Sequence, residues 1–545
     1  MTRRLSLLLP LLVLACAPAP QPQTAPPAPR AFATAVAQRV VLLSFDGLGA
    51  DALARQAGLP AFERLAREGA SARVIGVDPT LTGPAHVSIL TGADPQRTGI
   101  VSNRFHLPGT PPGQMTRAMD TDPDVETIIE AARRQGKRVG VVSFPTIDNR
   151  SPRRTADFGL AWSDPLVPAR LVTLTRADFK REWVPPTWTA RPQRRASFSP
   201  VMRARLAWDP SLDVDIVAYD TTDDRIENYD LYRVETEDEL PVDADGWFAI
   251  AQRTEHGLTG SWSKILRATP ALDVTIYRGA TSRNEAWPAS FRDLVDEHAG
   301  FWPGAPEEDL DVGPDVFLEQ MERLATYYTR AQLLAIERMP FDLLLLYQPQ
   351  IDQASHEFLG TADGDRLIRA AFVAADRALA RIAESLSPDD ALVVTADHGL
   401  TVARTQIRMN RLLAERGFAP RWRSYSSGAH AHLYRFGEPD DADAIVNMLT
   451  ETGLFEHIEK KTAAHHRNGG DVIATALPDT GISNDDVEPS IATPEPYGHH
   501  GALNHHRELH PAFLAIGSGV PAGSLGEIRQ TAIARFVAEL LGITW

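Results

Sequence analysis

A threonine hydroxyl lies where a helix is expected to begin. Thr82 stands two residues before Pro84, and a mostly apolar run from Val87 to Leu90 follows. A helix start gathers free N–H groups and the positive end of the helix dipole, so it stabilises an anion or an alkoxide. Threonine is a weak nucleophile until a base or a metal activates it. The alternative for Thr82 is a plain N-cap, and the other motifs must decide between the two.

Candidate metal ligands come shortly after three apolar runs that we expect to be strands, at residues 40–45, 341–347 and 391–395. These ligands are Asp46, Asp352, His356, Asp397 and His398. In open parallel sheets, ligands bind beyond the carboxyl ends of the strands. We therefore expect these side chains to converge on one edge of a sheet, although they are far apart in sequence.

The spacing within these groups suits metal binding. Asp352 and His356 are four residues apart, which places both side chains on one helix face, roughly 5–6 Å apart at Cβ. Asp397 and His398 are adjacent and can converge in a loop. A further histidine group lies at residues 498–501, where His499 and His500 are both candidates. Mixed carboxylate and imidazole ligands favour zinc, with manganese or iron as alternatives.

The chain alternates apolar runs with helical patterns, which predicts an α/β fold with a central, mostly parallel sheet flanked by helices. The expected strands span residues 40–45, 72–77, 138–144, 341–347, 391–395 and 513–516. The expected helices span residues 60–68, 124–135, 316–337, 367–385 and 527–541. Residues 165–312 interrupt the alternation and predict a β-rich insertion, which we interpret as a cap domain; a surface domain with no part in the site is the alternative. Residues 38–164 and 313–545 then form the catalytic domain.

The N-terminus is typical of an export signal. Arg3 and Arg4 precede an apolar stretch from Leu5 to Leu14, which is too short to span a bilayer comfortably. Cys16, the only cysteine, ends a segment that resembles a bacterial lipobox, so residues 1–16 predict a lipoprotein signal. Residues 17–37 are rich in Ala and Pro and predict an extended tether. We expect an exported protein, periplasmic or at the cell surface, with a lipid anchor on Cys16; an ordinary cleaved signal is the alternative.

The net charge of the 545-residue chain argues against one class of partner. The formal charge is −16, whereas a general binder of nucleic-acid polymers needs a basic face. A small phosphorylated substrate remains compatible, because bound metal ions reverse the local field.

As an ordered set, the motifs resemble those of the alkaline phosphatase superfamily, specifically its type I phosphodiesterase/nucleotide pyrophosphatase family. The matching segments are residues 44–47, 79–86, 91–92, 352–356, 395–399 and 500–501. The resemblance implies an alkaline phosphatase-like catalytic domain with two zinc ions. The implied ligands of one metal are Asp352, His356 and His500. The implied ligands of the other are Asp46, Asp397 and His398, together with the Thr82 oxygen.

The resemblance also assigns other residues. Asn103 matches the residue that donates a hydrogen bond to a phosphoryl oxygen; its alternative is an ordinary turn residue. His500 is favoured over His499 because Gly501 follows it, as in the family motif. His86 lies inside the nucleophile motif but is not a ligand in the family, and we interpret it as scaffold.

The implied activity is hydrolysis of a small phosphoester, such as a nucleotide or a lipid head group, through a phospho-threonine intermediate at Thr82. Two departures weaken the nucleotide expectation: Gly83 stands where the family often has an aromatic residue, and Ala85 replaces the usual Asn. A phosphomonoesterase or a phosphonate hydrolase on the same scaffold is the alternative. Its extra cations would come from Arg104, Arg153 and Arg154. A non-catalytic, surface-anchored metal- or phosphate-binding protein is a remote alternative.

Overall fold

The computed structural model describes residues 33–182, 199–209, 212–222, 224–235, 239–240, 246–306, 310 and 312–545. The predicted signal, Cys16 and the tether up to residue 32 lie outside these ranges. Within them, no helix combines the length and the apolar character that crossing a bilayer requires.

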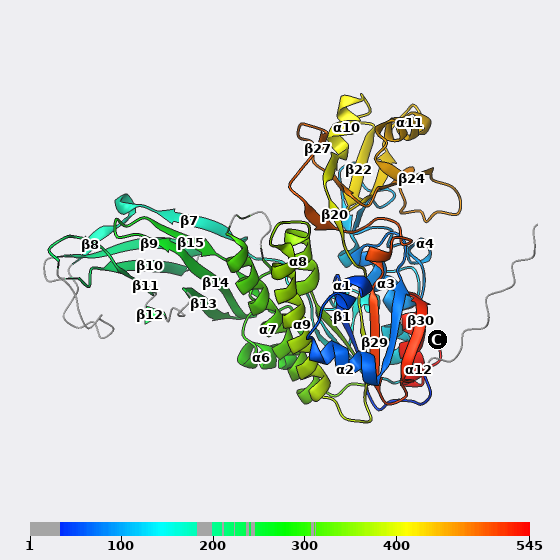
Figure 1. The fold of residues 1–545 in the computed structure, drawn as a ribbon, viewed down its shortest axis with the longest axis horizontal. Helices are drawn as coiled ribbons and strands as arrows, with labels where there is room; N and C mark the ends of the chain where they lie inside the picture. Colours follow the sequence, from blue (N-terminus) through cyan, green and yellow to red (C-terminus); the bar gives the residue numbers. More distant parts are fainter. Residues whose placement is uncertain are drawn as a thin grey trace, which may run out of the picture.

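A nine-stranded sheet forms the centre of the molecule (Figure 1). In spatial order its strands are β17 (Ala286–Trp287), β6 (Phe158–Leu160), β5 (Val139–Val142), β18 (Leu343–Gln348), β1 (Val40–Phe45), β19 (Ala391–Thr395), β29 (Ala512–Gly517), β2 (Ala70–Ile75) and β30 (Gly523–Arg529). β17 and β29 run antiparallel to their neighbours, and all other neighbouring pairs in this sheet are parallel. The predicted α/β fold with a mostly parallel central sheet is therefore confirmed.

Helices cover both faces of this sheet, which explains why its central strands are apolar throughout. Val41, Leu43 and Phe45 of β1 point into one core, and Val40 and Leu42 point into the other. The helices of the first core are α2 (Pro60–Glu68), α6 (Ala289–His298), α7 (Pro314–Arg338), α8 (Gln350–Phe358) and α9 (Gly364–Glu384). The helices of the second core are α3 (Thr82–Thr91), α5 (Ile128–Arg134) and α12 (Ala532–Leu541).

Two predicted helices begin later than expected. α5 begins at Ile128 because Thr127 and Glu130 form a capping box: the Glu130 N–H donates to the Thr127 hydroxyl at 3.2 Å, and the Thr127 N–H donates to the Glu130 carboxylate at 2.9 Å. The first part of the helix predicted at residues 527–541 is wrong. This segment belongs to β30, which pairs with β2, and α12 begins only at Ala532. Gly526, at φ 74°, places a bulge in the strand.

The predicted insertion is β-rich and forms an arm beside α6 and α7 (Figure 1). One antiparallel sheet contains β8 (Lys180–Glu182), β9 (Val201–Asp209), β10 (Leu212–Tyr219), β11 (Leu231–Glu235) and β12 (Glu239–Leu240). The other contains β7 (Arg170–Leu174), β13 (Trp247–Thr254), β14 (Gly257–Ala268), β15 (Val274–Arg278) and β16 (Ser282–Arg283). Both sheets contribute to one apolar core. β17 and α6 lie within residues 165–312 but pack with the central sheet, and the division into domains and the role as a cap stay predictions.

A second lobe, not anticipated from the sequence, lies between β19 and β29. Its sheet has the order β22 (Trp422–Ser427), β23 (His430–Arg435), β25 (Val472–Ala476) and β24 (Phe455–Lys460). Helices α10 (Met409–Glu415) and α11 (Ala442–Thr452) pack against it. In Figure 1 this lobe lies beyond the upper end of the central sheet, and the chain returns from it through residues 498–510.

Short elements complete the described chain. They are α1 (Ala50–Ala54), α4 (Pro95–Thr98), β3 (Arg104–Phe105), β4 (Thr116–Arg117), β20 (Thr401–Ala403), β21 (Thr405–Arg408), β26 (Thr480–Ser483), β27 (Ile491–Ala492), β28 (Tyr497–His499) and the 3₁₀ turns Ala118–Asp120, Pro152–Arg154, Arg176–Asp178 and Arg507–Leu509.

Candidate metal centre and nucleophile

The carboxyl ends of β1, β18 and β19 bring five predicted ligands to one edge of the sheet. Asp46 directly follows β1, while Asp397 and His398 follow β19; α8 begins just after β18 and carries Asp352 and His356. The Nε2 atom of His398 lies 3.1 Å from Asp397 Oδ2 and 3.7 Å from Asp46 Oδ1. His356 Nε2 lies 3.4 Å from Asp352 Oδ2. The two predicted ligand sets also adjoin one another, because ligand atoms of Asp352 and His500 from one set and of His398 from the other lie within 4.8 Å of one another.

Thr82 is the first residue of α3, and its hydroxyl points into this cluster. The Thr82 Oγ1 atom lies 3.3 Å from His398 Nε2. Leu81 occupies the N-cap position and has no side chain that caps the helix, so Thr82 is not the N-cap. The rest of α3 is buried. The helix thus presents the Thr82 hydroxyl, together with the positive end of its dipole, to the candidate metal ligands.

Asn103 lies against the same helix start. Its Oδ1 accepts a hydrogen bond of 2.7 Å from the Gly83 N–H. Because the carbonyl end of the amide is used in this way, its NH₂ group is the end left to donate to a ligand. The backbone C=O of Asn103 accepts from the Ala118 N–H at 2.9 Å, which fixes the loop in place.

Two candidate histidines are oriented by backbone carbonyls. His356 Nδ1 donates to Gly498 O at 2.8 Å, and His500 Nδ1 donates to Thr80 O at 2.9 Å. These hydrogen bonds fix each tautomer with the proton on Nδ1, which leaves Nε2 as the acceptor that binds a metal. This is the second-layer arrangement that metal-binding histidines usually have.

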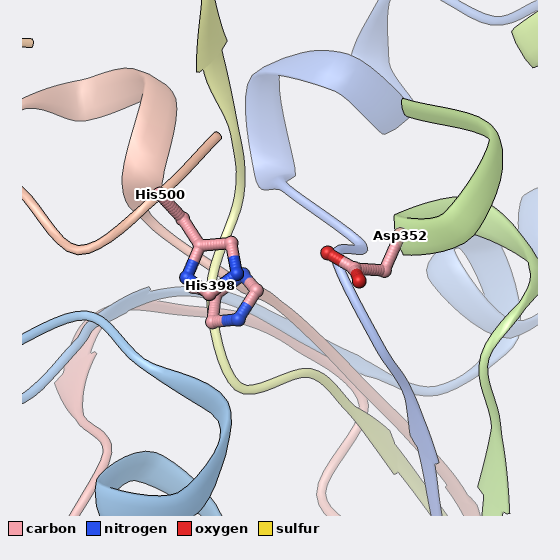
Figure 2. A group of neighbouring side chains, drawn as sticks. All are labelled: Asp352, His398 and His500. Carbon is pink, nitrogen blue, oxygen red and sulfur yellow. The ribbon is translucent and has the colours of Figure 1, made fainter. Parts of the chain in front are cut away.

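His500 rather than His499 joins the cluster. The His500 ring stacks on the His398 ring, with centroids 3.6 Å apart and planes 17° from parallel. Ligand atoms of Asp352, His398 and His500 lie within 4.8 Å of one another, and Figure 2 shows the Asp352 carboxylate facing the two rings. His499 is instead held by a hydrogen bond of 2.7 Å between its Nε2 and Pro478 O.

The buried carboxylates lack enough protein partners. Tyr347 OH donates to Asp46 Oδ2 at 2.6 Å, and the N–H groups of Gly47 and His398 donate to Asp397 Oδ1. Asp46 Oδ1, Asp352 Oδ1 and Asp397 Oδ2 have no hydrogen-bond partner among the described residues. Three buried, unsatisfied carboxylate oxygens beside imidazoles form a donor set that fits divalent metal ions.

The charges of the site follow from burial and from these neighbours. Burial raises the pKa of Asp46, and the nearby Asp397 and Asp352 carboxylates raise it further. Burial likewise raises the pKa of Asp352. Burial opposes ionisation of Asp397 as well, but His398 and His86 outweigh it and hold its pKa below the ordinary value. Burial lowers the pKa of His500, which favours the neutral imidazole that binds a metal.

His86 is buried beneath the site and uses both ring nitrogens within the protein. Its Nδ1 lies 2.9 Å from Thr82 O, and its Nε2 lies 2.9 Å from Ser44 Oγ. Although His86, Asp46 and Asp397 lie close enough to share a metal, these two hydrogen bonds occupy the imidazole. The ring therefore supports the first turn of α3, in line with its interpretation as scaffold.

The sequence comparison identifies the family to which this architecture belongs. The profile of the family described as type I phosphodiesterase / nucleotide pyrophosphatase matches residues 40–502. The chain belongs to this family. Among curated proteins, none matches the chain by sequence.

Solved structures of family-like fold extend over nearly the whole chain. Murine ectonucleotide pyrophosphatase / phosphodiesterase 5 is 15% identical, with 93% of this chain and 96% of that chain covered and a TM-score of 0.53. An inactive form of the murine protein, in complex with AMP, is 14% identical with the same coverage and TM-score. Phosphonoacetate hydrolase from Sinorhizobium meliloti 1021, in complex with phosphonoformate, is 15% identical, with 94% and 96% covered and a TM-score of 0.51. At these identities the likeness concerns the fold.

Two of the three arginines considered for a monoester substrate bond to other protein groups, and only Arg104 is exposed. Arg154 is buried and bonded to Asp122 and Asp148, both at 2.8 Å. Arg153 donates to Pro123 O at 2.6 Å. Arg104 is exposed on β3. Two of the three side chains thus hold the loop around residues 119–154 together.

A cavity of about 350 Å³ lies beside Tyr347, the residue that hydrogen-bonds Asp46. Its aromatic lining comes from Phe144, Trp162, Trp287 and Tyr347. Trp162 is 39% exposed. Ser143, Thr146 and Asn149, on the loop that borders the cavity, have φ values of 56°, 72° and 63°. Positive φ is costly for a β-branched residue such as Thr146, and such strain gathers at ligand sites.

Sequence reasoning missed the groups that position the predicted ligands. Tyr347 carries the one hydroxyl near the end of the apolar strand β18, and this polar group was the available signal. The carbonyls of Thr80 and Gly498 left no signal, because every residue has a carbonyl and only the fold directs it to a histidine.

Proposed function

We propose that the protein is a metal-dependent phosphoester hydrolase of the phosphodiesterase/nucleotide pyrophosphatase type, with Thr82 as the nucleophile. The observation that carries this proposal is the position of the Thr82 hydroxyl, at the start of α3 and 3.3 Å from His398 Nε2 within the carboxylate–histidine cluster. An N-cap threonine would have its hydroxyl on the helix backbone instead.

Residues of this cluster would hold two metal ions, and the mixed carboxylate and imidazole donors favour zinc. The proposed ligands of one ion are Asp352, His356 and His500. The proposed ligands of the other are Asp46, Asp397, His398 and the Thr82 oxygen. When bound, the metal pair lowers the pKa of the Thr82 hydroxyl and neutralises charge on the phosphoryl and leaving oxygens.

Thr82 Oγ then attacks phosphorus in line with the leaving oxygen, and the bond from phosphorus to the leaving alcohol or phosphate breaks. The product is a phospho-threonine. The Asn103 NH₂ group donates to a non-bridging phosphoryl oxygen, and the dipole of α3 stabilises the same negative charge. Water attacks phosphorus in a second step, which releases phosphate or a phosphomonoester and restores the Thr82 hydroxyl.

The substrate is proposed to be a small phosphoester whose organic group enters the cavity beside Tyr347. The aromatic side chains there suit a planar or apolar group. The AMP complex of the murine relative supports nucleotides as the first class to assay. The exposed face of Trp162 offers a stacking surface that Gly83 does not.

The test compares substrates and a nucleophile variant. Zinc-loaded protein lacking residues 1–32 is assayed in parallel on bis-p-nitrophenyl phosphate and p-nitrophenyl phosphate, with a chelator control. We expect chelator-sensitive hydrolysis that favours the diester. Thr82→Ala should abolish turnover while its zinc content, measured by mass spectrometry, stays at the wild-type level. An active Thr82→Ala enzyme would exclude this nucleophile, and preference for the monoester would favour the phosphatase alternative.

We also propose that the protein is exported and anchored by a lipid on Cys16. The charged start, the apolar stretch and the lipobox-like segment support this. Labelled palmitate should be incorporated by the full-length chain and not by Cys16→Ser; equal labelling of both would contradict the anchor.

A further inference from the structure

A second cluster of histidines and a carboxylate lies outside the Thr82 site. Glu456 is on β24, whereas His505 and His506 are in the turn that follows the His500 segment. Ligand atoms of these three residues lie within 4.8 Å of one another. Without a metal, Glu456 Oε2 and His506 Nε2 share a hydrogen bond of 2.7 Å, and His505 Nε2 lies 3.7 Å from the same oxygen. The three side chains come from two segments, β24 and the turn after His500, that are about fifty residues apart in the sequence.

The arrangement has the dimensions of a metal site. With bond lengths of about 2.0–2.2 Å, donor atoms around a tetrahedral zinc ion lie about 3.3 Å apart. Both imidazoles face the same carboxylate oxygen at distances on either side of this value. Adjacent residues usually diverge, but here the turn holds the two rings 4.1 Å apart.

The solvent exposure of the three side chains is also compatible with a metal site. The Glu456 side chain is 12% exposed and its other oxygen, Oε1, accepts from the Leu503 N–H, so the carboxylate is fixed. His506 is 23% exposed, and His505 is 63% exposed. The open side next to His505 leaves room for water as a fourth ligand.

We propose that Glu456, His505 and His506 bind a third divalent metal ion, of the zinc type, that is separate from the Thr82 site. The proposal does not depend on the catalytic roles assigned above. It rests on three nitrogen and oxygen donors that converge from β24 and from the turn after His500.

This metal would fasten a segment that positions the catalytic groups. His500 Nδ1 and the Gly501 N–H bond to the carbonyl and the hydroxyl of Thr80, at 2.9 and 3.1 Å. The Asn504 N–H donates to Asp78 Oδ1 at 2.6 Å. Residues 500–504 therefore form hydrogen bonds to the chain just before Thr82. The third metal would connect His505 and His506, which directly follow these residues, to Glu456 on β24. It would thereby link the second lobe to the segment that carries Thr82.

The direct experiment counts metal ions per chain. Tag-free protein comprising residues 33–545 is equilibrated with excess zinc, passed through a desalting column and measured by inductively coupled plasma mass spectrometry. The double variant His505→Ala/His506→Ala should bind one zinc ion fewer per chain than the wild type. The criterion is the difference between the two proteins, so it stands whether or not the Thr82 site binds two ions as proposed.

A matched control is available on the same strand. His457 and His465 both lie 3.2 Å from Glu459 Oε1, but these three residues do not reach the mutual proximity of the Glu456 group in the described chain. His457→Ala/His465→Ala should keep the wild-type zinc content. Equal zinc in wild type and His505→Ala/His506→Ala would overturn the proposal, as would equal losses in both double variants.

A second variant guards against misfolding. Glu456→Gln preserves the shape of the side chain and the acceptor for the Leu503 N–H, but it removes the charge that binds the metal. We expect it to lose the same single zinc ion, with an unchanged circular dichroism spectrum. A folded Glu456→Gln protein that retains every zinc ion would contradict the site.

Discussion

Gly83, the residue after the proposed nucleophile, has no space for a side chain. A Cβ built there would lie 2.4 Å from the Ala118 Cβ and 3.1 Å from Asn103 Oδ1. The 3₁₀ turn at Ala118–Asp120 thus fills the place where an aromatic residue would stand. We expect Gly83→Ala to displace Asn103 and Thr82, to lower kcat, and to reduce the free energy of unfolding by about 1–3 kcal/mol.

A second substitution, at Ala118, tests whether the close contact causes these losses. In Gly83→Ala/Ala118→Gly the 2.4 Å contact with the Ala118 Cβ is removed and the 3.1 Å contact with Asn103 Oδ1 remains, so we expect stability and turnover to return in part. Urea denaturation and hydrolysis of the diester measure the two properties, and Ala118→Gly alone is the control. A Gly83→Ala protein that matches the wild type in both assays would contradict the packing argument.

At the same scale, the sequence indicated which polar side chains would gather better than it indicated the groups that position them. Asp46, Asp397 and His398 follow strands, Asp352 and His356 have helical spacing, and the resemblance added His500. Tyr347 and the carbonyls of Thr80 and Gly498 act through positions that only tertiary packing creates.

Among the elements, β1 and β19 are joined at the end opposite the site by a partly buried ion pair, in which Asp390 is buried and Arg39 is 27% exposed. Arg39 Nε and Nη2 donate to Asp390 Oδ1 and Oδ2 at 3.0 and 2.6 Å, and the Ser387 N–H donates to the same carboxylate. Burial alone would raise the pKa of Asp390, but the hydrogen bonds from Arg39 and Ser387 outweigh it and hold the pKa below its ordinary value. The ionised carboxylate therefore stabilises the folded state.

Asp390→Asn should lower the free energy of unfolding at pH 7 by about 1–3 kcal/mol, because Arg39 loses its charged partner. A depressed folded-state pKa means that this contribution is present above the unfolded pKa of about 3.9 and is lost as the pH falls through the folded pKa. The difference between wild type and variant should thus shrink below about pH 4. Urea denaturation from pH 3 to 8 measures it, and the proposed hydrolysis of the diester at pH 7, as a control, should not change. A difference that is constant with pH would contradict this linkage.

Element by element, the strongly apolar strands were predicted most accurately: 40–45 and 391–395 match β1 and β19 in full. Such strands are buried on both faces, so their sequence carries an unbroken signal. Residues 527–529, the last part of β30, were predicted as the start of a helix, because β30 lies at the sheet edge and is mostly exposed. The second lobe was not predicted from the sequence, because its strands mix Ser, His and Arg with apolar residues.

For the whole molecule, the arm formed by β7 to β15 leaves and rejoins the chain at one place. Val167 and Thr281 form an antiparallel bridge, in which the Thr281 N–H donates to Val167 O at 2.9 Å. The ends of the arm are therefore adjacent, and a short Asn-Gly turn can connect them. The arm contacts α7 through Trp247 and Trp262, whose rings lie 4.7 and 4.2 Å from the Arg323 guanidinium, and through Lys264, which pairs with Glu319.

We expect a protein in which residues 169–279 are replaced by such a turn to fold with a lower melting temperature, because the face of α7 becomes exposed. It should keep the wild-type zinc content and hydrolyse bis-p-nitrophenyl phosphate at close to the original rate, since the metal ligands and the cavity beside Tyr347 lie outside the deleted segment. Adding Arg323→Ala to the shortened and the full-length chains is the control for the α7 contact, and it should destabilise only the latter. Loss of turnover with zinc retained would instead make the arm a cap that the substrate requires.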